Sequence, residues 1–308
     1  MTADLRIGVI GLDTSHVPAF ARLLNDSSHP HHVPGGRMVA AYPSYSADIA
    51  SSAGRVDGFI SDVTPLGVAM VDSIAALLEQ VDAVLLESVD GRRHLPEARP
   101  VIAAGKPLYI DKPLAHNYAD AAEIARLARE AGCPLFSASS LRYDANIAAL
   151  RADPTLGAVL GCDAFSPASL EPNNPGFFWY GVHGVETLYT FMGPGCERVM
   201  AHHSPDADLV VGYWADGRLG TVRGTRSGEH GYGATVFGAE RIGQVQYSQD
   251  VPLYAQLLRQ IVPFFQTGAA PVPLDETLEM MALMQAAISS QAEGRAVYLA
   301  EVRRQAGA

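Results

Sequence analysis

The sequence is poor in cysteine, has no long hydrophobic run and carries a deficit of positive charge. Its three cysteines, Cys133, Cys162 and Cys196, are odd in number and widely spaced, which argues against a disulfide framework or zinc site and indicates reduced thiols. No apolar run approaches the roughly 20 residues that span a bilayer, and a strand pattern begins by Leu5, leaving no room for a secretory signal. The formal net charge of −11 argues against nucleic acid and anionic membrane surfaces as partners. We therefore expect a cytoplasmic protein with a small-molecule partner.

The length of 308 residues and the 48% hydrophobic content predict two domains with sizeable cores, residues 1–140 and residues 141–308. In the first segment, apolar strand patterns alternate with helical ones, which predicts a doubly wound parallel sheet, an α/β Rossmann domain. From residue 157 onward, strand patterns follow one another, with a tight hairpin turn at Asp216-Gly217. This second segment is predicted to be an α+β domain with a large, mostly antiparallel open sheet.

One short stretch, residues 105–115, combines a strand with charged residues. Leu108 to Ile110 reads as a buried strand, Asp111 and Lys112 follow at its carboxyl end, and Pro113 stops the strand because it has no N–H to donate. Asn117 is placed to cap the helix that comes next. Ligands of open α/β sheets bind at this edge, so Lys112 is either a ligand-binding cation or a surface lysine paired with Asp111.

The run Gly105-Lys106-Pro107, an apolar strand and Asp111-Lys112-Pro113 resembles the signature of the Gfo/Idh/MocA oxidoreductases. The resemblance extends over nearly the whole chain and implies that family's two-domain fold. It implies NAD or NADP as cofactor and a sugar, polyol or related hydroxyl compound as substrate. It also implies that Lys112 contacts both the nicotinamide and the substrate hydroxyl group.

The glycine-rich fingerprint of the family is degenerate here. The turn Gly11-Leu12-Asp13-Thr14-Ser15-His16 follows the first strand and opens a helix, but it keeps only the first glycine of Gly-x-Gly-x-x-Gly. A carboxylate at Asp13 repels phosphate unless it turns away, and we expect Asp13 or Thr14 to cap the helix. Thr14 and Ser15 can offer donors at the helix N-terminus, where the helix dipole favours phosphate. These six residues are the candidate pyrophosphate site, and loss of dinucleotide binding is the alternative.

Two further loops bear on the cofactor. The second strand ends in Tyr42-Pro43-Ser44-Tyr45, without the acidic residue that binds the ribose hydroxyls in NAD-preferring folds. NADP is therefore at least as well suited as NAD, with Ser44 beside it. The resemblance places the loop from Ser88 to His94 against the cofactor, although His94 can equally be an ordinary residue at a helix N-terminus. Arg92 and Arg93 in this loop are solvated charges or anion clamps.

A second chemical element lies around His183. A histidine that begins a helix can face a cleft, and its unperturbed pKa of about 6.5 suits proton transfer. The resemblance places the catalytic histidine here, in Asp-x-Gly-x-His, and Gly181 and His183 match while Trp179 replaces the aspartate. Glu186, one helical turn on, either supplies the missing carboxylate or caps the helix. Trp179 and Tyr180 form a platform for a sugar ring or belong to the core.

Three other segments carry weaker signals. Ser139 to Tyr143 resembles the family segment that crosses between the domains, where Arg142 and Tyr143 either border the substrate or brace the junction. The loop with His29, His31 and His32 lacks an obvious carboxylate or thiolate partner, so it is predicted to be solvated, and the sequence assigns no metal ligands. Residues 54–67 read as an inserted loop or short helix.

Together these features predict an NAD(P)-dependent oxidoreductase in which Lys112 stabilises an alkoxide and His183 moves the proton. The open sheet of the second domain is expected to form a homo-oligomer interface. The alternative keeps the fold without the redox step: a lyase, an isomerase or a sugar-derivative binding protein that has lost dinucleotide binding.

Overall fold

The structure is a computed structural model that describes residues 4–248 and 250–307. The chain divides into two compact units. The first comprises the residues up to Ala115 together with Glu123–Ser137 and Val251–Leu274. The second comprises His116–Ala122, Ala138–Asp250 and the residues from Asp275 onward. A C-terminal segment with one long helix therefore groups with the N-terminal unit.

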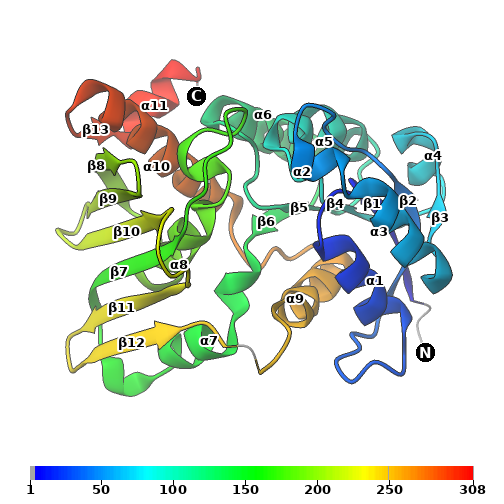
Figure 1. Cartoon of the computed structure of the whole chain (residues 1–308), viewed down its shortest axis with the longest axis horizontal. Helices are drawn as coiled ribbons and strands as arrows, with labels where there is room; N and C mark the ends of the chain where they lie inside the picture. Colours follow the sequence, from blue (N-terminus) through cyan, green and yellow to red (C-terminus); the bar gives the residue numbers. More distant parts are fainter. Residues whose placement is uncertain (1–3, 249, 308) are drawn as a thin grey trace. The chain divides into compact units, whose positions relative to one another are not determined.

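Within the described residues, the first unit is built on a six-stranded parallel sheet with the strand order β3-β2-β1-β4-β5-β6 (Figure 1). The strands are β1 (Leu5–Ile10), β2 (Gly36–Tyr42), β3 (Ala69–Met70), β4 (Ala83–Leu86), β5 (Leu108–Asp111) and β6 (Leu135–Ala138). Strands β4, β5 and β6 are buried at every position, as strands covered on both faces should be. The order reverses between β1 and β4, which creates the switch point where such sheets bind ligands.

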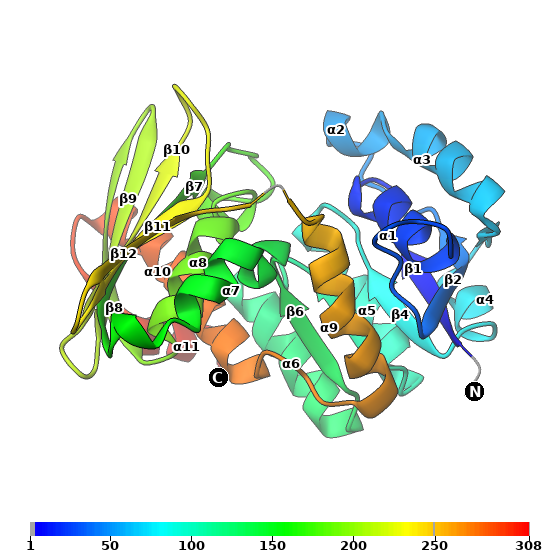
Figure 2. The same cartoon turned by 90° about the horizontal axis from the view of Figure 1, so that it is seen from below.

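Helices cover both faces of this sheet. They are α1 (His16–Asn25), α2 (Ala50–Ala53), α3 (Val56–Val63), α4 (Ile74–Leu78), α5 (His94–Ala103), α6 (Tyr118–Ala131) and α9 (Leu253–Thr267), with short 3₁₀ turns η1 (Thr64–Leu66) and η2 (Gly91–Arg93). Figures 1 and 2 show α1 and α9 on one face and α5 on the other, and α1 packs against α9. Asn117 caps α6 as predicted, because its Oδ1 accepts the Asp120 N–H at 2.8 Å. The segment 54–67 forms α3 and η1.

The second unit contains a seven-stranded mixed sheet with the order β12-β11-β7-β10-β9-β8-β13. Its strands within the described part of the chain are β7 (Val159–Pro167), β8 (Cys196–Ser204), β9 (Ala207–Trp214), β10 (Leu219–Thr225), β11 (Gly233–Gly238), β12 (Ile242–Gln246) and β13 (Val297–Tyr298). Only the β7–β10 pair is parallel among the strand pairs described. The hairpin between β9 and β10 turns at Gly217, whose φ of 89° requires glycine. The predicted fold class is confirmed.

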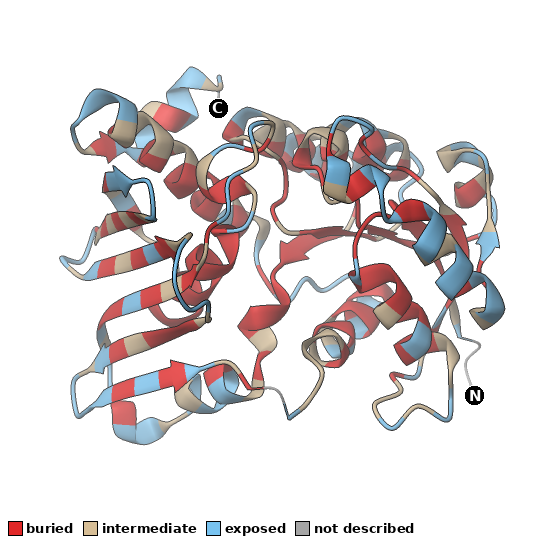
Figure 3. Ribbon diagram, in the orientation of Figure 1, coloured by how far each residue is buried: buried red, intermediate tan, exposed pale blue. Residues whose placement is uncertain are grey.

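The helices of the second unit are α7 (Ala145–Arg151), α8 (Val182–Met192), α10 (Leu274–Glu293) and α11 (Leu299–Gln305), with 3₁₀ turns η3 (Ser140–Tyr143), η4 (Pro154–Leu156) and η5 (Gly176–Phe178). Helix α8 contacts β7 and β10 and is buried along its whole length. Burial alternates along the sheet strands, as expected when one face is covered and the other is open (Figure 3). Among the described residues, no helix has the length and apolar character needed to cross a membrane.

Candidate active site

The turn after β1 keeps its one glycine for a steric reason. Gly11 has a φ of 89°, and a Cβ atom there would lie 2.3 Å from the backbone nitrogen of Ser88. The N–H groups of Gly11 and Leu12 donate to the carbonyls of Tyr42 and Ser44, at 3.1 and 3.2 Å. The turn is therefore fixed against the end of β2 and the loop after β4, which are the segments that border the cofactor in a Rossmann domain.

Asp13 points into the protein. Its carboxylate accepts hydrogen bonds from the Ser52 hydroxyl at 2.6 Å and from the Val89 N–H at 3.0 Å, and the residue is fully buried. Burial raises the pKa of Asp13, and the nearby charge of Glu97 adds to the rise although the two hydrogen bonds oppose it. Asp13 does not cap α1, because its carboxylate is bound by Ser52 and Val89. Ser15 precedes the helix without a side-chain capping bond, and the Thr14 hydroxyl accepts the His16 N–H at 3.5 Å.

These positions bear on whether a dinucleotide can be accommodated. Ser15 is exposed at the N-terminus of α1, and the first turn of that helix contains no acidic residue. The Asp13 carboxylate faces Ser52 and Val89 instead of the exposed helix end. The close glycine turn and a helix N-terminus without competing acid fit a pyrophosphate group, even though the second and third glycines are absent.

The candidates Ser44, Ser88 and His94 form one buried network. Both serine hydroxyls donate to the carboxylate of Glu97, the Ser88 bond being 2.6 Å long. Arg93 donates from Nε to Ser44 Oγ and to Glu97, each at 2.8 Å. His94 is fully buried, with Nε2 lying 2.7 Å from the Ser88 carbonyl and Nδ1 lying 3.2 Å from the Leu114 carbonyl. His94 therefore braces the loop.

Arg92, in the same loop, is held by acidic neighbours. Its guanidinium group pairs with Asp90 and Asp48, at 2.7 and 2.9 Å. Both arginine side chains are about one-third exposed, and Arg93 differs in pairing with one carboxylate, that of Glu97, instead of two.

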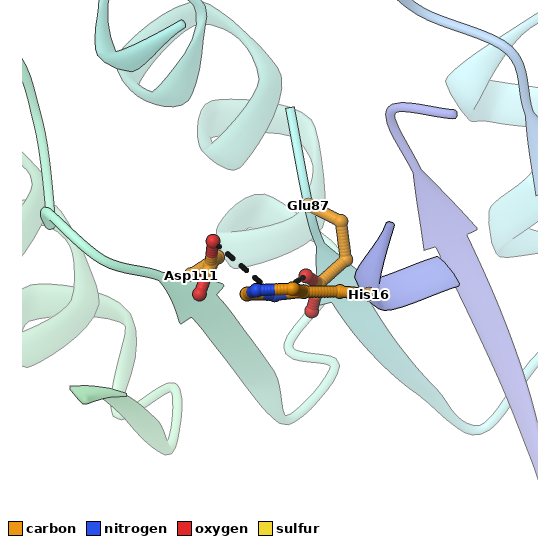
Figure 4. A group of neighbouring side chains, drawn as sticks. All are labelled: His16, Glu87 and Asp111. Atoms are coloured by element: carbon orange, nitrogen blue, oxygen red, sulfur yellow. Dashed lines mark hydrogen bonds and ion pairs between the residues drawn. The ribbon is translucent and has the colours of Figure 1, made fainter. Parts of the chain in front are cut away.

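Lys112 follows β5 and is held by its neighbour. Its ammonium group lies 3.0 Å from Asp111 Oδ2, and its side chain is 13% exposed. His16 and Glu87 lie at the same edge, because α1 begins at His16 and Glu87 directly follows β4 (Figure 4). Nδ1 of His16 is 3.1 Å from Glu87 Oε2 and 3.4 Å from Asp111 Oδ2. Lys112 is thus the outermost member of a buried group of four charge-bearing side chains.

The two carboxyl groups of this cluster respond differently to it. Burial raises the pKa of Glu87 to about 7, and the charge of Asp111 adds to the rise. Burial alone would also raise the pKa of Asp111, but the charges of His16 and Lys112 outweigh it and lower the pKa. At neutral pH Asp111 is therefore the stable anion that pairs with Lys112.

His183 lies at the start of α8 in the second unit. Its Nδ1 is 2.7 Å from Ser139 Oγ, and its ring meets the edges of Tyr180 and Tyr232, with ring centroids 5.2 and 5.6 Å apart. The backbone of Ser139 lowers the pKa of the Glu186 carboxyl group. Ser139 therefore lies close to both His183 and Glu186.

Glu186 and Arg142 form a buried ion pair. Arg142 donates from Nε to Glu186 and from its terminal nitrogen to Glu276 at 2.7 Å. Burial raises the pKa of Glu186, and the charge of Arg142 opposes that rise. The hydroxyl group of Tyr143 is buried without a hydrogen-bond partner among the described residues. These contacts favour the bracing role for Arg142 over direct contact with a substrate.

Tyr180 lines a cavity of about 600 Å³ within the second unit. The volume falls in the range of small-molecule sites, about 300–1,000 Å³. The lining residues are Pro167, Ser169, Leu170, Tyr180, Thr225, Arg226, His230 and Tyr232. Two of them, Tyr180 and Tyr232, are the residues whose rings contact His183, so the cavity adjoins the candidate catalytic histidine. Trp179 is half-buried.

Sequence reasoning missed four residues of these clusters as candidates: Glu87, Glu97, Ser52 and Ser139. Glu87 had a usable signal, since an acidic residue directly after the buried strand β4 must lie at the ligand edge of the sheet. Ser139 follows β6 in the same way. Glu97 and Ser52 lie within helices and carry no such signal.

Comparison with known proteins finds a family match for the N-terminal segment. Residues 5–139 match the model of the Gfo/Idh/MocA family, described as "Oxidoreductase family, NAD-binding Rossmann fold". This match covers less than half of the chain. Among proteins of curated function, none has a significantly similar sequence.

Solved structures resemble the chain over nearly its full length. GenD2 from gentamicin A biosynthesis, solved in complex with NAD, is 20% identical, with a TM-score of 0.76 and 97% of each chain covered. A myo-inositol 2-dehydrogenase from Lactobacillus plantarum is 16% identical, with a TM-score of 0.77, covering 96% of this chain and 99% of its own. A scyllo-inositol dehydrogenase from Lactobacillus casei is 14% identical, with a TM-score of 0.76, covering 97% and 100%. At these identities the likeness shows the fold alone.

Proposed function

We propose that the protein is an NAD(P)-dependent oxidoreductase that acts on a hydroxyl group of a sugar, polyol or related compound. The observation that carries this proposal is the position of Lys112. It is a nearly buried lysine at the carboxyl end of β5, held by Asp111, in a Rossmann domain of an oxidoreductase family. A cation at that edge is suited to an oxygen that becomes negatively charged during the reaction.

The chemistry divides between two residues of the chain. The bound nicotinamide supplies the hydride acceptor or donor. The Lys112 ammonium group stabilises the developing alkoxide, and Asp111 keeps that group charged and in place. His183 takes or returns the hydroxyl proton, with Ser139 fixing the orientation of its ring.

The substrate class is inferred from the cavity beside His183. Its wall combines the aromatic rings of Tyr180 and Tyr232 with the guanidinium group of Arg226. Aromatic rings suit the apolar face of a sugar or cyclitol ring, and the polar groups suit its hydroxyls. Inositol dehydrogenases among the structural relatives make inositols a reasonable first substrate panel.

The cofactor is proposed to be NADP or NAD, with NADP at least as well suited. Ser44 stands where NAD-preferring folds carry an acid, and its hydroxyl is bound by Arg93. An arginine near the end of β2 can accommodate a 2′-phosphate, which an acid there would repel.

A titration with NADH and NADPH tests the proposal, using cofactor fluorescence or calorimetry. We expect binding of at least one of them, followed by turnover of a polyol in a panel that includes myo-inositol and scyllo-inositol. Binding of neither cofactor at millimolar concentration would overturn the redox proposal.

The degenerate glycine turn supports a second candidate function, a non-redox lyase, isomerase or sugar-derivative binding protein. Asp13 and His16 occupy glycine positions, and both side chains are committed to buried contacts. The titration with NADH and NADPH separates the two candidate functions. The non-redox candidate predicts that a sugar derivative binds without either cofactor.

The exposed face of the seven-stranded sheet supports the expected homo-oligomer. It carries large apolar side chains that are at least one-third exposed: Leu219, Phe237, Ile242 and Tyr298. Apolar residues on an open sheet face favour association with another protein surface. Light scattering after size-exclusion chromatography tests this, and a purely monomeric species at micromolar concentration would contradict it.

A further inference from the structure

Three potential metal ligands converge at the carboxyl edge of the first sheet. They are Nδ1 of His16, a carboxylate oxygen of Glu87 and a carboxylate oxygen of Asp111, and all lie within 4.8 Å of one another. Figure 4 shows the carboxyl groups of Glu87 and Asp111 meeting the imidazole ring of His16. The three residues lie far apart in the sequence, and the parallel topology brings them together because β4, β5 and the start of α1 meet at this edge.

The hydrogen bonding of this cluster is incomplete. The single N–H that Nδ1 can carry makes a well-aligned hydrogen bond with only one oxygen. Two carboxylate oxygens, Glu87 Oε2 and Asp111 Oδ2, nevertheless lie within 3.4 Å of that nitrogen. The other carboxylate oxygen of Glu87, Oε1, is buried and has no hydrogen-bond partner among the described residues. Buried carboxylate oxygens without donors are costly, so their presence calls for a cation.

The distances from the imidazole nitrogen to the two carboxylates match a metal site. Bonds from a first-row metal ion to imidazole nitrogen and carboxylate oxygen are about 2.0–2.2 Å long, which places neighbouring ligands about 2.9–3.5 Å apart in octahedral or tetrahedral geometry. The observed separations of 3.1 and 3.4 Å from Nδ1 lie within that range. Glu87 Oε1 provides a further oxygen of the same carboxylate.

We propose that His16, Glu87 and Asp111 bind a divalent first-row transition metal ion. One imidazole and two carboxylates suit Mn²⁺, Fe²⁺ or Zn²⁺ better than Ca²⁺, which prefers oxygen ligands throughout. The two charges of the ion balance the two carboxylates. Lys112 stays hydrogen-bonded to Asp111 as an outer neighbour of the ion. The site does not depend on the proposed redox activity, since hydride transfer to a nicotinamide needs no metal.

Equilibrium dialysis with Mn²⁺ alone and with Zn²⁺ alone tests the site, with bound metal counted by mass spectrometry. We expect about one ion per chain in the metal-stripped wild type, and a rise in melting temperature on adding the ion. Glu87→Gln and Asp111→Asn keep the side-chain shape and should weaken binding by about tenfold or more while the circular dichroism spectrum stays unchanged.

Two control variants address other sources of binding. His31→Ala removes a histidine of the loop with His29 and His32, and His203→Ala removes a histidine paired with Asp208 at 2.6 Å. Both should bind the ion as wild type does. The proposal is overturned if the wild type binds neither ion at millimolar concentration. It is equally overturned if Glu87→Gln and Asp111→Asn bind as tightly as wild type, or if His31→Ala abolishes binding.

Discussion

The hydroxyl oxygen of Ser139 lies 2.7 Å from Nδ1 of His183, and both residues are buried. The hydroxyl group of Ser139 also accepts the Leu141 N–H, 3.2 Å away. This bond holds the Ser139 hydroxyl in place, and the hydroxyl in turn fixes one ring nitrogen of His183. In hydrolases and related enzymes, a third group often orients the catalytic base in this way.

We expect His183→Asn to remove a limb of the pH–rate profile near neutrality, because the histidine is the proposed proton carrier. Ser139→Ala should lower turnover by roughly tenfold, whereas His183→Asn should lower it by roughly a hundredfold or more. Ser139→Ala should also shift the near-neutral limb of the pH–rate profile. Ser139→Thr keeps the hydroxyl and should restore most activity, while Ser140→Ala serves as the neighbouring control. A Ser139→Ala enzyme with the wild-type pH profile would assign Ser139 a purely structural role.

Lys112 offers a second test, with a matched control in the same chain. Lys112→Met should leave the fold intact and lower turnover by at least about a hundredfold, the usual scale for losing a charge-stabilising group. Lys106, the other lysine of the chain, precedes β5 and donates to the Val81 carbonyl at 2.8 Å. Lys106→Met should affect stability and leave the turnover of the folded protein near wild type. Wild-type turnover in Lys112→Met on the true substrate would contradict the proposed role.

Arg93 provides a test of cofactor preference. Its guanidinium group binds Ser44 at the end of β2 and Glu97 one helical turn on. If it also meets a 2′-phosphate, Arg93→Gln should weaken NADPH binding by roughly tenfold, the scale of a charge-assisted hydrogen bond, and leave NADH binding nearly unchanged. Parallel titrations with the two cofactors measure the difference, and Arg99→Gln, on the exposed surface beside Glu123, is the control. Equal losses for both cofactors would point to a structural effect.

The local patterns of this sequence were sufficient to predict the fold. The strand at residues 108–110, the Asn117 cap and the turn at Asp216-Gly217 all depend on neighbours in sequence, and the structure contains each of them. The convergence of His16, Glu87 and Asp111 depends on strand order, which no local pattern encodes. Similarly, the inward turn of Asp13 depends on Ser52, a partner 39 residues away in a short helix.

The three cysteines should be unreactive in the folded protein. All three are buried free thiols, and burial raises the pKa of Cys133 to about 11 and that of Cys196 to about 12. Burial also raises the pKa of Cys162. Because the thiolate is the reactive form, Ellman's reagent at pH 8 should label fewer than one thiol per chain in buffer and three in denaturant. Rapid labelling of a thiol in the native protein would show that its surroundings open readily.

The last prediction concerns Asp13 and the pH dependence of stability. Burial raises its pKa in the folded protein above the ordinary value of 3.8. Between the pKa of Asp13 in the unfolded chain and its higher pKa in the folded protein, Asp13 is protonated when folded and ionised when unfolded. The free energy of unfolding therefore falls as the pH rises through this range. Asp13→Asn removes the titration and keeps an oxygen that can accept the Val89 N–H. We expect this variant to be more stable than wild type at neutral pH, with the difference shrinking toward pH 4.

Asp82, whose pKa is shifted in the opposite direction to that of Asp13, supplies the control. The hydrogen bonds from Arg6 lower the pKa of Asp82, so its contribution is present at neutral pH and is lost as the solution becomes acidic. Asp82→Asn should therefore be slightly less stable than wild type at neutral pH, and the two should converge in acid. Urea unfolding at a series of pH values measures both variants. If the stability of Asp13→Asn relative to wild type falls instead of rising between pH 4 and neutral pH, the hydrogen bonds of the ionised carboxylate outweigh the cost of burying it, and the inferred direction of its pKa shift is wrong.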